Sequence, residues 1–149
     1  MREINKIIVH CSAHRTASFD DVLNWHTLEK PDGNGWDDIG YHWAVCYGGQ
    51  EYEGRPLQIQ GAHCKGYNED SIGACLLGDK EFSFNQLETL RMQIYAWEVM
   101  IGHKLEVFAH YELNNTGKTC PNIDADLLRK FIRCERYLGR VEIYKLMGV

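Results

Sequence analysis

Short apolar runs alternate along the chain with segments whose apolar residues recur at helical spacing. Residues 7–9 and 72–77 are apolar and rich in β-branched side chains, so the pattern predicts buried strands there. Ser83 and Gln86 are spaced as a capping box, in which each side chain bonds the other residue's backbone N–H group. They open the clearest predicted helix, over residues 83–101, whose buried face would carry Leu87, Leu90, Ile94, Trp97 and Ile101.

Capping and turn residues predict the elements in between. Ser18 and Asp21 indicate the start of a helix. The glycines at 48–49 indicate a hairpin turn, and Asn122 or Asp124 would cap a final helix. The remaining expected elements are a loop at 30–40, strands at 43–47, 50–53 and 105–109, and a last helix that carries Leu127, Leu128, Phe131 and Leu138 and stops at Gly139.

Strands that alternate with helices predict an α/β fold with a central mixed β-sheet flanked by helices. The 149 residues suit a single domain over residues 1–149. No apolar run approaches the roughly 20 residues of a membrane span. Residues 7–9 are too short for the apolar region of a signal peptide. We therefore expect no membrane insertion, no signal peptide and synthesis in the cytoplasm.

Charge and cysteine content narrow the class of protein further. The formal net charge of −5 gives no general basis for binding nucleic acid. Six cysteines without an export signal are expected to be free thiols rather than a disulfide framework. With the modest chain length, this favours a reduced monomer.

Three residues with metal-binding side chains lie near the ends of predicted strands. His10 follows the first strand, His110 follows the strand at 105–109, and Cys120 lies in a loop ten positions later. Side chains at adjacent strand ends can converge above the sheet edge. Two imidazoles and one thiolate would hold Zn²⁺ with its fourth position open, as in catalytic zinc sites. The spacing alone leaves a second interpretation open, in which the histidines belong to the core or surface and the cysteine is unrelated.

Neighbouring residues are alternative ligands. Cys11 adjoins His10, but side chains alternate between the two faces of a strand, so Cys11 is expected to point away from the site. His14, His63 and Cys64 lie in predicted loops from which they could approach it.

Six motifs in a fixed order add a family resemblance. They are IVHCSA at 8–13, GWDDIGYH at 35–42, EGR at 53–55, GAHCKGYN at 61–68 with SIG at 71–73, HYE at 110–112 and KTCP at 118–121. In this order they resemble the zinc-dependent N-acetylmuramoyl-L-alanine amidase family, which includes the peptidoglycan-recognition proteins, and especially its small phage lysozymes of the T-seven type. The resemblance covers about residues 10–121. The loop at 29–36 is longer, and the stretch before His10 shorter, than in the phage lysozymes.

The resemblance implies the amidase and peptidoglycan-recognition-protein fold. It also implies hydrolysis of the amide between N-acetylmuramic acid and L-alanine of the stem peptide. It makes His10, His110 and Cys120 the ligands of one zinc ion per chain. The expected absence of an export signal fits a phage endolysin, which is made in the host cytoplasm and acts on the cell wall after release, and also a cytosolic recycling amidase that acts on imported muropeptides. The small size and the phage resemblance favour the endolysin.

The same resemblance assigns roles to four further residues. Lys118 would stabilise the oxyanion, and Tyr41 would orient the zinc water or relay a proton. His63 and Asn68 would contact the peptidoglycan or muramyl-peptide substrate. Without the resemblance, these residues would be a surface lysine, a buried tyrosine and two residues that brace a loop. The sequence does not assign Arg55, Trp36 and Trp43 to the substrate groove or to the scaffold.

The main alternative function is a peptidoglycan-binding receptor that does not hydrolyse its ligand. Some members of the resembled family are of this kind. They usually lack the cysteine ligand, so Cys120 favours the enzyme.

Overall fold

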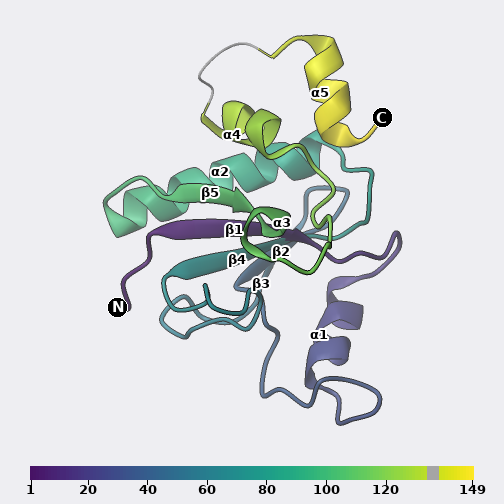
Figure 1. Ribbon diagram of the computed structural model, residues 1–149, viewed down its shortest axis with the longest axis vertical. Coiled ribbons are helices and arrows are strands. Elements are labelled where there is room, and N and C mark those ends of the chain that lie inside the picture. Colours follow the sequence, from purple (N-terminus) through teal and green to yellow (C-terminus); the bar gives the residue numbers. More distant parts are fainter. Residues whose placement is uncertain (134–137) are drawn as a thin grey trace.

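A five-stranded mixed sheet forms the centre of the molecule (Figure 1). The computed structural model describes residues 1–133 and 138–149. The strands are β1 (Lys6–Cys11), β2 (Trp43–Val45), β3 (Glu51–Glu53), β4 (Ser71–Leu76) and β5 (Glu106–Ala109), in the order β3-β2-β4-β1-β5. β1 pairs in parallel with β4 and β5, β2 pairs in parallel with β4, and β3 is antiparallel to β2. The predicted α/β fold with a mixed sheet is confirmed.

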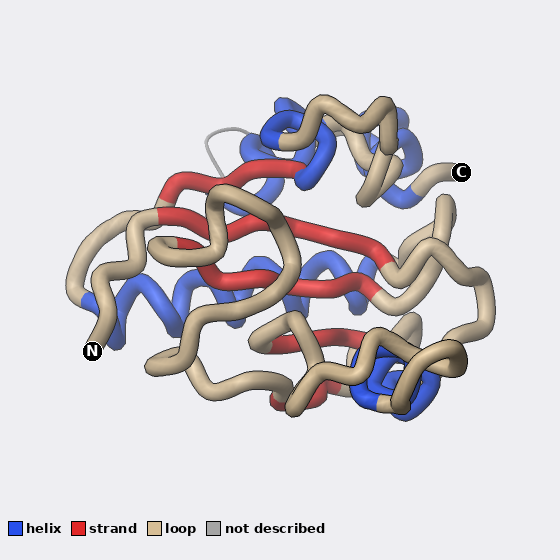
Figure 2. Tube along the Cα trace, turned by 60° about the horizontal axis from the view of Figure 1, so that its bottom comes forward, coloured by secondary structure: helices blue, strands red, loops and turns tan. Residues whose placement is uncertain are grey.

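Most of the helices cover one face of this sheet, and the first helix and several loops lie on the other (Figure 2). The helices are α1 (Phe19–Thr27), α2 (Phe84–Ile101), α3 (His110–Leu113), α4 (Ala125–Arg133) and α5 (Arg140–Met147). α2 runs along the sheet, and α4 and α5 pack against α2. The larger hydrophobic core lies between the sheet and these three helices.

The alternation of side chains along β1 separates this core from the opposite face. Ile7, Val9 and Cys11 belong to the core under α2. His10 therefore faces the other side of the sheet, as strand geometry requires. The prediction that Cys11 and His10 point to opposite faces is confirmed.

A smaller apolar cluster lies on the face that His10 shares. Val22 of α1 packs there with Ile39, Ala44 of β2, Cys75 of β4 and Leu77. Ser18 caps α1 as predicted, because its hydroxyl accepts from the backbone N–H of Asp21 at 3.1 Å while Asp21 accepts from the backbone N–H of Ser18 at 2.8 Å. The cluster and α1 therefore lie on the same face of the sheet as His10.

The start of α2 is only half as predicted. The hydroxyl of Ser83 accepts from the backbone N–H of Gln86 at 2.9 Å. The side chain of Gln86 does not return the bond. It is buried and donates to the carbonyls of Val45 at 2.9 Å and Leu77 at 3.0 Å, which ties α2 to the end of the sheet. The predicted capping box is therefore wrong in its second half.

The predicted last helix is two helices. α4 ends at Arg133, residues 134–137 lie outside the described part of the chain, and α5 begins at Arg140. Gly139 is the N-cap of α5 rather than the stop of one long helix. Of the two proposed caps, Asp124 serves α4, because its carboxylate accepts from the backbone N–H of Leu127 at 2.9 Å.

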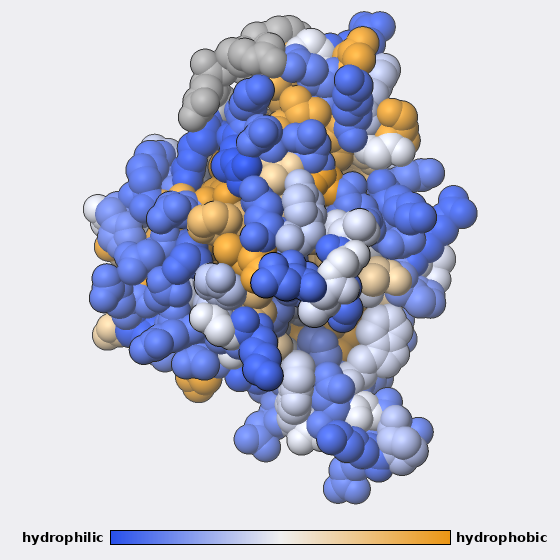
Figure 3. Space-filling model, in the orientation of Figure 1, coloured by the Kyte–Doolittle hydropathy of each residue, from blue (hydrophilic) through white to orange (hydrophobic). Residues whose placement is uncertain are grey.

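The surface seen in Figure 3 is mostly hydrophilic, and apolar side chains show in scattered patches, among them near α4 and α5 and, at the centre left, near β5. Within the described ranges, none of the helices has the length and apolar character needed to cross a membrane.

Candidate metal centre

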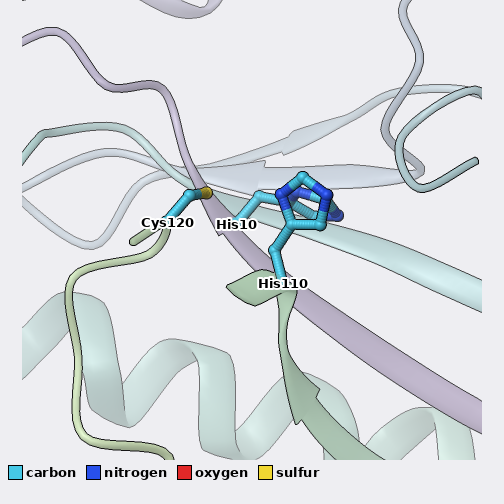
Figure 4. A group of neighbouring side chains, drawn as sticks. All are labelled: His10, His110 and Cys120. Atoms are coloured by element: carbon cyan, nitrogen blue, oxygen red, sulfur yellow. The ribbon is translucent and has the colours of Figure 1, made fainter. Parts of the chain in front are cut away.

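His10, His110 and Cys120 come together at one edge of the sheet (Figure 4). One potential ligand atom from each lies within 4.8 Å of those of the other two. His10 is the fifth residue of β1 and so lies inside the strand, rather than after it as the sequence suggested. β5 pairs in parallel with β1, with Val9 opposite Ala109. The next residue on each side is a histidine, so His10 and His110 lie side by side.

Hydrogen bonds at the end of β5 fix the position of His110. Ala109, the N-cap of α3, has no polar side chain, and the carboxylate of Glu112 accepts its backbone N–H at 2.8 Å. Arg129 of α4 holds the same carboxylate by two bonds, of 2.8 and 3.1 Å. The backbone N–H of Tyr111 donates to the carbonyl of Cys120 at 2.9 Å, which ties the cysteine loop to α3.

The donor set fits a zinc ion. Burial, followed by the neighbouring histidines, places the pKa of His10 well below its usual value. Burial and then the charge of Lys118 lower the pKa of His110. Both imidazoles are therefore neutral near pH 7 and keep a lone pair for a metal. Imidazole nitrogen and thiolate sulfur are ligands that Zn²⁺ prefers, and the three potential ligand atoms lie within 4.8 Å of one another.

Cys120 is also bonded to the end of β1. The backbone N–H of Cys11 donates to its sulfur at 3.2 Å, and the two sulfurs are 3.9 Å apart. The bond to the Cys11 thiol and burial raise the pKa of Cys120, whereas a coordinated metal deprotonates such a thiol. The side chain of Cys11 lies on the core face of β1. Cys120 therefore supplies the sulfur that lies near the two histidines.

Tyr41 lies against the predicted ligands. Its ring centroid is 5.0 Å from that of His10. Burial, reinforced by the nearby cysteines, raises the pKa of Tyr41 well above its usual value, so the hydroxyl keeps its proton. Within residues 1–133 and 138–149, this hydroxyl has no hydrogen-bond partner. It is therefore free to bond a substrate or a water molecule.

Lys118 is exposed and lies close enough to His110 for its charge to lower the pKa of that residue. Among the described residues it forms no ion pair. It lines a surface hollow of about 440 Å³ together with Tyr111 and Asn122. The structure thus leaves the ammonium group available beside the metal-ligand cluster.

The ring of His63 contacts the ring of His10, and the side chain of Asn68 bonds the backbone of His63. Nδ1 of His63 is 3.0 Å from Nε2 of His10. Burial lowers the pKa of His63 to about 3, with smaller contributions from neighbouring histidines and arginines. The amide oxygen of Asn68 accepts from the backbone N–H groups of His63 and Cys64, both at 2.9 Å. The amide nitrogen of Asn68 forms no protein bond in the described part of the chain.

An arginine that the sequence did not single out secures this loop. The guanidinium of Arg2 donates to the carbonyls of Leu57 at 2.8 Å, Asn68 at 3.3 Å and Ser71 at 2.7 Å, and also to Glu69. It thereby holds both ends of the segment that carries His63. No local sequence pattern predicts contacts over such separations.

The three unassigned residues fall into separate places. Trp43 is buried and packs edge-on against Trp97 of α2, so it belongs to the core. Arg55 donates to the carbonyls of Ile39 at 3.0 Å and Gln60 at 2.8 Å, so it braces loops. Trp36 is 37% exposed, beside His26.

A His–His–Cys set with one buried and two half-buried members lies at the carboxyl ends of parallel strands, with a free hydroxyl and a free ammonium beside it. This arrangement is typical of a metal-dependent hydrolase. Three protein ligands leave a position open for water, as catalytic zinc sites do.

Comparison with known proteins identifies the family. The sequence profile of the N-acetylmuramoyl-L-alanine amidase family matches residues 1–123. The endolysin of Escherichia phage T7 is 33% identical over 132 residues, which cover 79% of this chain and 80% of that protein. The chain therefore belongs to the N-acetylmuramoyl-L-alanine amidase family.

Solved structures share the fold. The N-acetylmuramoyl-L-alanine amidase LysC from Clostridium intestinale URNW superposes with a TM-score of 0.76 at 20% identity, over 89% of this chain and 87% of that one. A chain of the ectodomain complex of peptidoglycan recognition proteins LCa and LCx, bound to tracheal cytotoxin, superposes with a TM-score of 0.72 at 25% identity, over 87% of this chain and 83% of that one. These likenesses confirm the fold expected from the six motifs.

Proposed function

We propose that this chain is a zinc-dependent peptidoglycan amidase that cleaves the bond between N-acetylmuramic acid and L-alanine of the stem peptide. The observation that carries the proposal is the convergence of His10, His110 and Cys120 within 4.8 Å in a member of the amidase family. Because all three ligands come from one chain, we propose one zinc ion per monomer.

The residues around the metal ligands suit amide hydrolysis. A bound zinc ion supplies a Lewis acid and a water nucleophile that is available near neutral pH. The ammonium of Lys118 would stabilise the negative charge that develops on the scissile carbonyl oxygen. The hydroxyl of Tyr41, which keeps its proton, would position the attacking water or carry a proton toward the departing nitrogen.

The substrate contacts that we propose for the loop at 61–68 are limited by the bonds already present. The amide nitrogen of Asn68 can bond a stem-peptide carbonyl without breaking its bonds to the backbone. Both ring nitrogens of His63 have protein partners, so only its ring surface is available to substrate. A peptidoglycan-derived ligand is supported by the structurally similar recognition proteins, whose complex contains tracheal cytotoxin.

The endolysin relatives support a biological role in cell lysis. We propose that the chain is made in a host cytoplasm and reaches the wall after release, without inserting into the membrane and without binding nucleic acid. Its action would be on the murein layer itself.

Release of peptides from purified murein tests the proposed function. The zinc-loaded protein should free stem peptides with a new N-terminal alanine while the glycan strands stay intact. EDTA should abolish the release, and added zinc should restore it. Binding to murein without release of peptides would instead support the non-hydrolytic receptor and reject the amidase.

A further inference from the structure

The hydrogen bonds of His63 lead away from the metal ligands into the scaffold. On one side, its Nδ1 lies 3.0 Å from Nε2 of His10. On the other side, its Nε2 lies 3.3 Å from the hydroxyl oxygen of Ser71. That oxygen is 2.6 Å from the carbonyl oxygen of Tyr67. Four groups are thus joined in one chain from a loop carbonyl to a predicted zinc ligand.

The direction of each bond follows from the number of protons available. A carbonyl oxygen only accepts, so the single hydroxyl proton of Ser71 goes to Tyr67. The Ser71 oxygen must then accept the proton on Nε2 of His63. A neutral imidazole carries one proton, so Nδ1 of His63 is an acceptor and receives the N–H of His10. His10 therefore carries its proton on Nε2 and has its lone pair on Nδ1.

We propose that His63 and Ser71 are positioning residues that set the tautomer of His10 and present its Nδ1 to the metal. Metal-bound histidines commonly donate their second ring N–H to a fixed acceptor, which fixes the ring and raises the basicity of the ligand. Here the acceptor is a second histidine, which is itself oriented by a buried serine. This inference rests on the proposed zinc site and assigns to His63 a role other than binding substrate.

Two glycines hold the ring of His63 in this orientation. A Cβ atom at Gly73 of β4 would lie 2.5 Å from ring carbons of His63, and one at Gly61 would lie 2.6 Å from the ring. The ring therefore occupies space that side chains at these positions would fill. β4 is the direct neighbour of β1, so the glycine at 73 lets the ring pack beside His10.

The tautomers can be measured in the metal-free protein. Long-range ¹H–¹⁵N correlation spectra of the imidazole rings should show the proton on Nε2 in both His10 and His63. In Ser71→Ala, the single tautomer of His63 should give way to a mixture. A proton on Nδ1 of His63 in the wild type would overturn the proposal, whatever the activity of the enzyme.

Zinc affinity, measured by competition with a chromophoric chelator, tests the consequence. His63→Leu removes the acceptor and should weaken zinc binding about 10–100-fold, the usual effect of losing such a partner. His63→Asn places an amide oxygen near the position of Nδ1 and should recover most of the affinity. Gly73→Ala keeps every hydrogen-bonding group but displaces the ring, so it should also weaken binding.

Ser12→Ala is the matched control for Ser71→Ala. The Ser12 hydroxyl also bonds backbone near β1, at Gly78, but lies outside the chain from Tyr67 to His10. The zinc affinity of Ser12→Ala should stay within about threefold of that of the wild type. Equal affinity in folded His63→Leu and wild type would reject the inference alone. Failure of the wild type to bind zinc would reject the proposed function, and the tautomers would still be measurable.

Discussion

At the scale of single residues, Tyr41→Phe deletes one hydroxyl and keeps the ring against His10. In the described part of the chain this hydroxyl has no partner, so its loss should leave the melting temperature nearly unchanged. Turnover should fall about 10²–10⁴-fold, the usual contribution of a positioned acid–base group. Paired melting and single-turnover measurements test this. A Phe variant with wild-type turnover would exclude a catalytic role for Tyr41.

Lys118→Ala should lower kcat about 10²–10³-fold, the effect of removing one oxyanion donor. Zinc content should not change, because the ammonium is beside the ligands and is not one of them. Lys80→Ala, which removes another exposed lysine, is the control and should keep full activity. If Lys118→Ala instead raised KM at constant kcat, the ammonium would act in substrate binding.

The two neighbouring sulfurs should differ in their effect on the metal. Cys120→Ala should lose most of the zinc and the activity. Cys11→Ala should keep both, because the backbone N–H that donates to Cys120 remains in the variant. Metal analysis after dialysis measures the difference. Loss of zinc from Cys11→Ala would show that its thiol, 3.9 Å from that of Cys120, is needed at the site.

The sequence predicted where single residues lie better than what they bond. Alternation in β1 placed His10 and Cys11 on opposite faces, because the period of a strand is fixed. The link from His63 through Ser71 to Tyr67 could not be predicted. It depends on how a loop folds back onto β4, and loop contacts have no periodic signal.

At the scale of elements, one buried carboxylate joins α2, α4 and the start of β5. Glu98 of α2 accepts from Arg133 of α4 at 2.6 Å, from the backbone N–H of Leu105 at 2.9 Å and from Lys104 at 3.1 Å. Burial alone would raise its pKa, but these donors outweigh burial and lower it. The ionised form therefore stabilises the packing of the helices on the sheet edge.

Glu98→Gln should reduce the free energy of unfolding at pH 7 by about 1.5–3 kcal/mol, the range for hydrogen bonds to a charged group. A carboxylate with a lowered pKa stabilises the fold above its unfolded pKa of about 4.3, and this stabilisation disappears as the pH falls through the folded pKa. The difference between variant and wild type should therefore shrink below about pH 4. Urea unfolding at several pH values measures it.

Glu88→Gln on the same helix is the control, because Glu88 pairs with Arg91 at a more exposed position. Exposed pairs contribute about 0–1 kcal/mol, so this variant should stay close to wild type at every pH. A pH-independent difference for Glu98→Gln would mean that shape, not charge, makes Glu98 important.

Elements with strong periodicity were predicted well, and their ends less so. The spacing of apolar residues predicted the length of α2 correctly. The side chain of Gln86 does not form the predicted cap because it is buried and donates to two backbone carbonyls instead. α3 has only four residues and was not predicted, since a single turn carries no period. The division between α4 and α5 was missed because apolar residues continue past α4, at Leu138.

At the scale of the whole molecule, the candidate metal centre joins segments that are far apart in the sequence. His10 lies in β1, His110 begins α3, and Cys120 lies in the loop beyond it. The predicted strand ends made these residues candidates, and only the ordered motifs favoured them as metal ligands. Their distances depend on β1 and β5 pairing in parallel across about a hundred residues, and no local pattern specifies that pairing.

Because the ligands meet only in the folded chain, zinc binding should stabilise the whole fold. Free zinc at about 100 times its dissociation constant would add about 2.7 kcal/mol to the free energy of unfolding. For a chain of this size, each kcal/mol raises Tm by about 2–4 °C, so loading should raise Tm by about 5–10 °C. Calorimetry of EDTA-treated and zinc-loaded protein measures the shift. Cys120→Ala should lose most of it and Cys11→Ala should retain it, since only the first removes a ligand. An equal shift in Cys120→Ala would mean that the metal stabilises the chain from another site, and the assignment of the centre would fail.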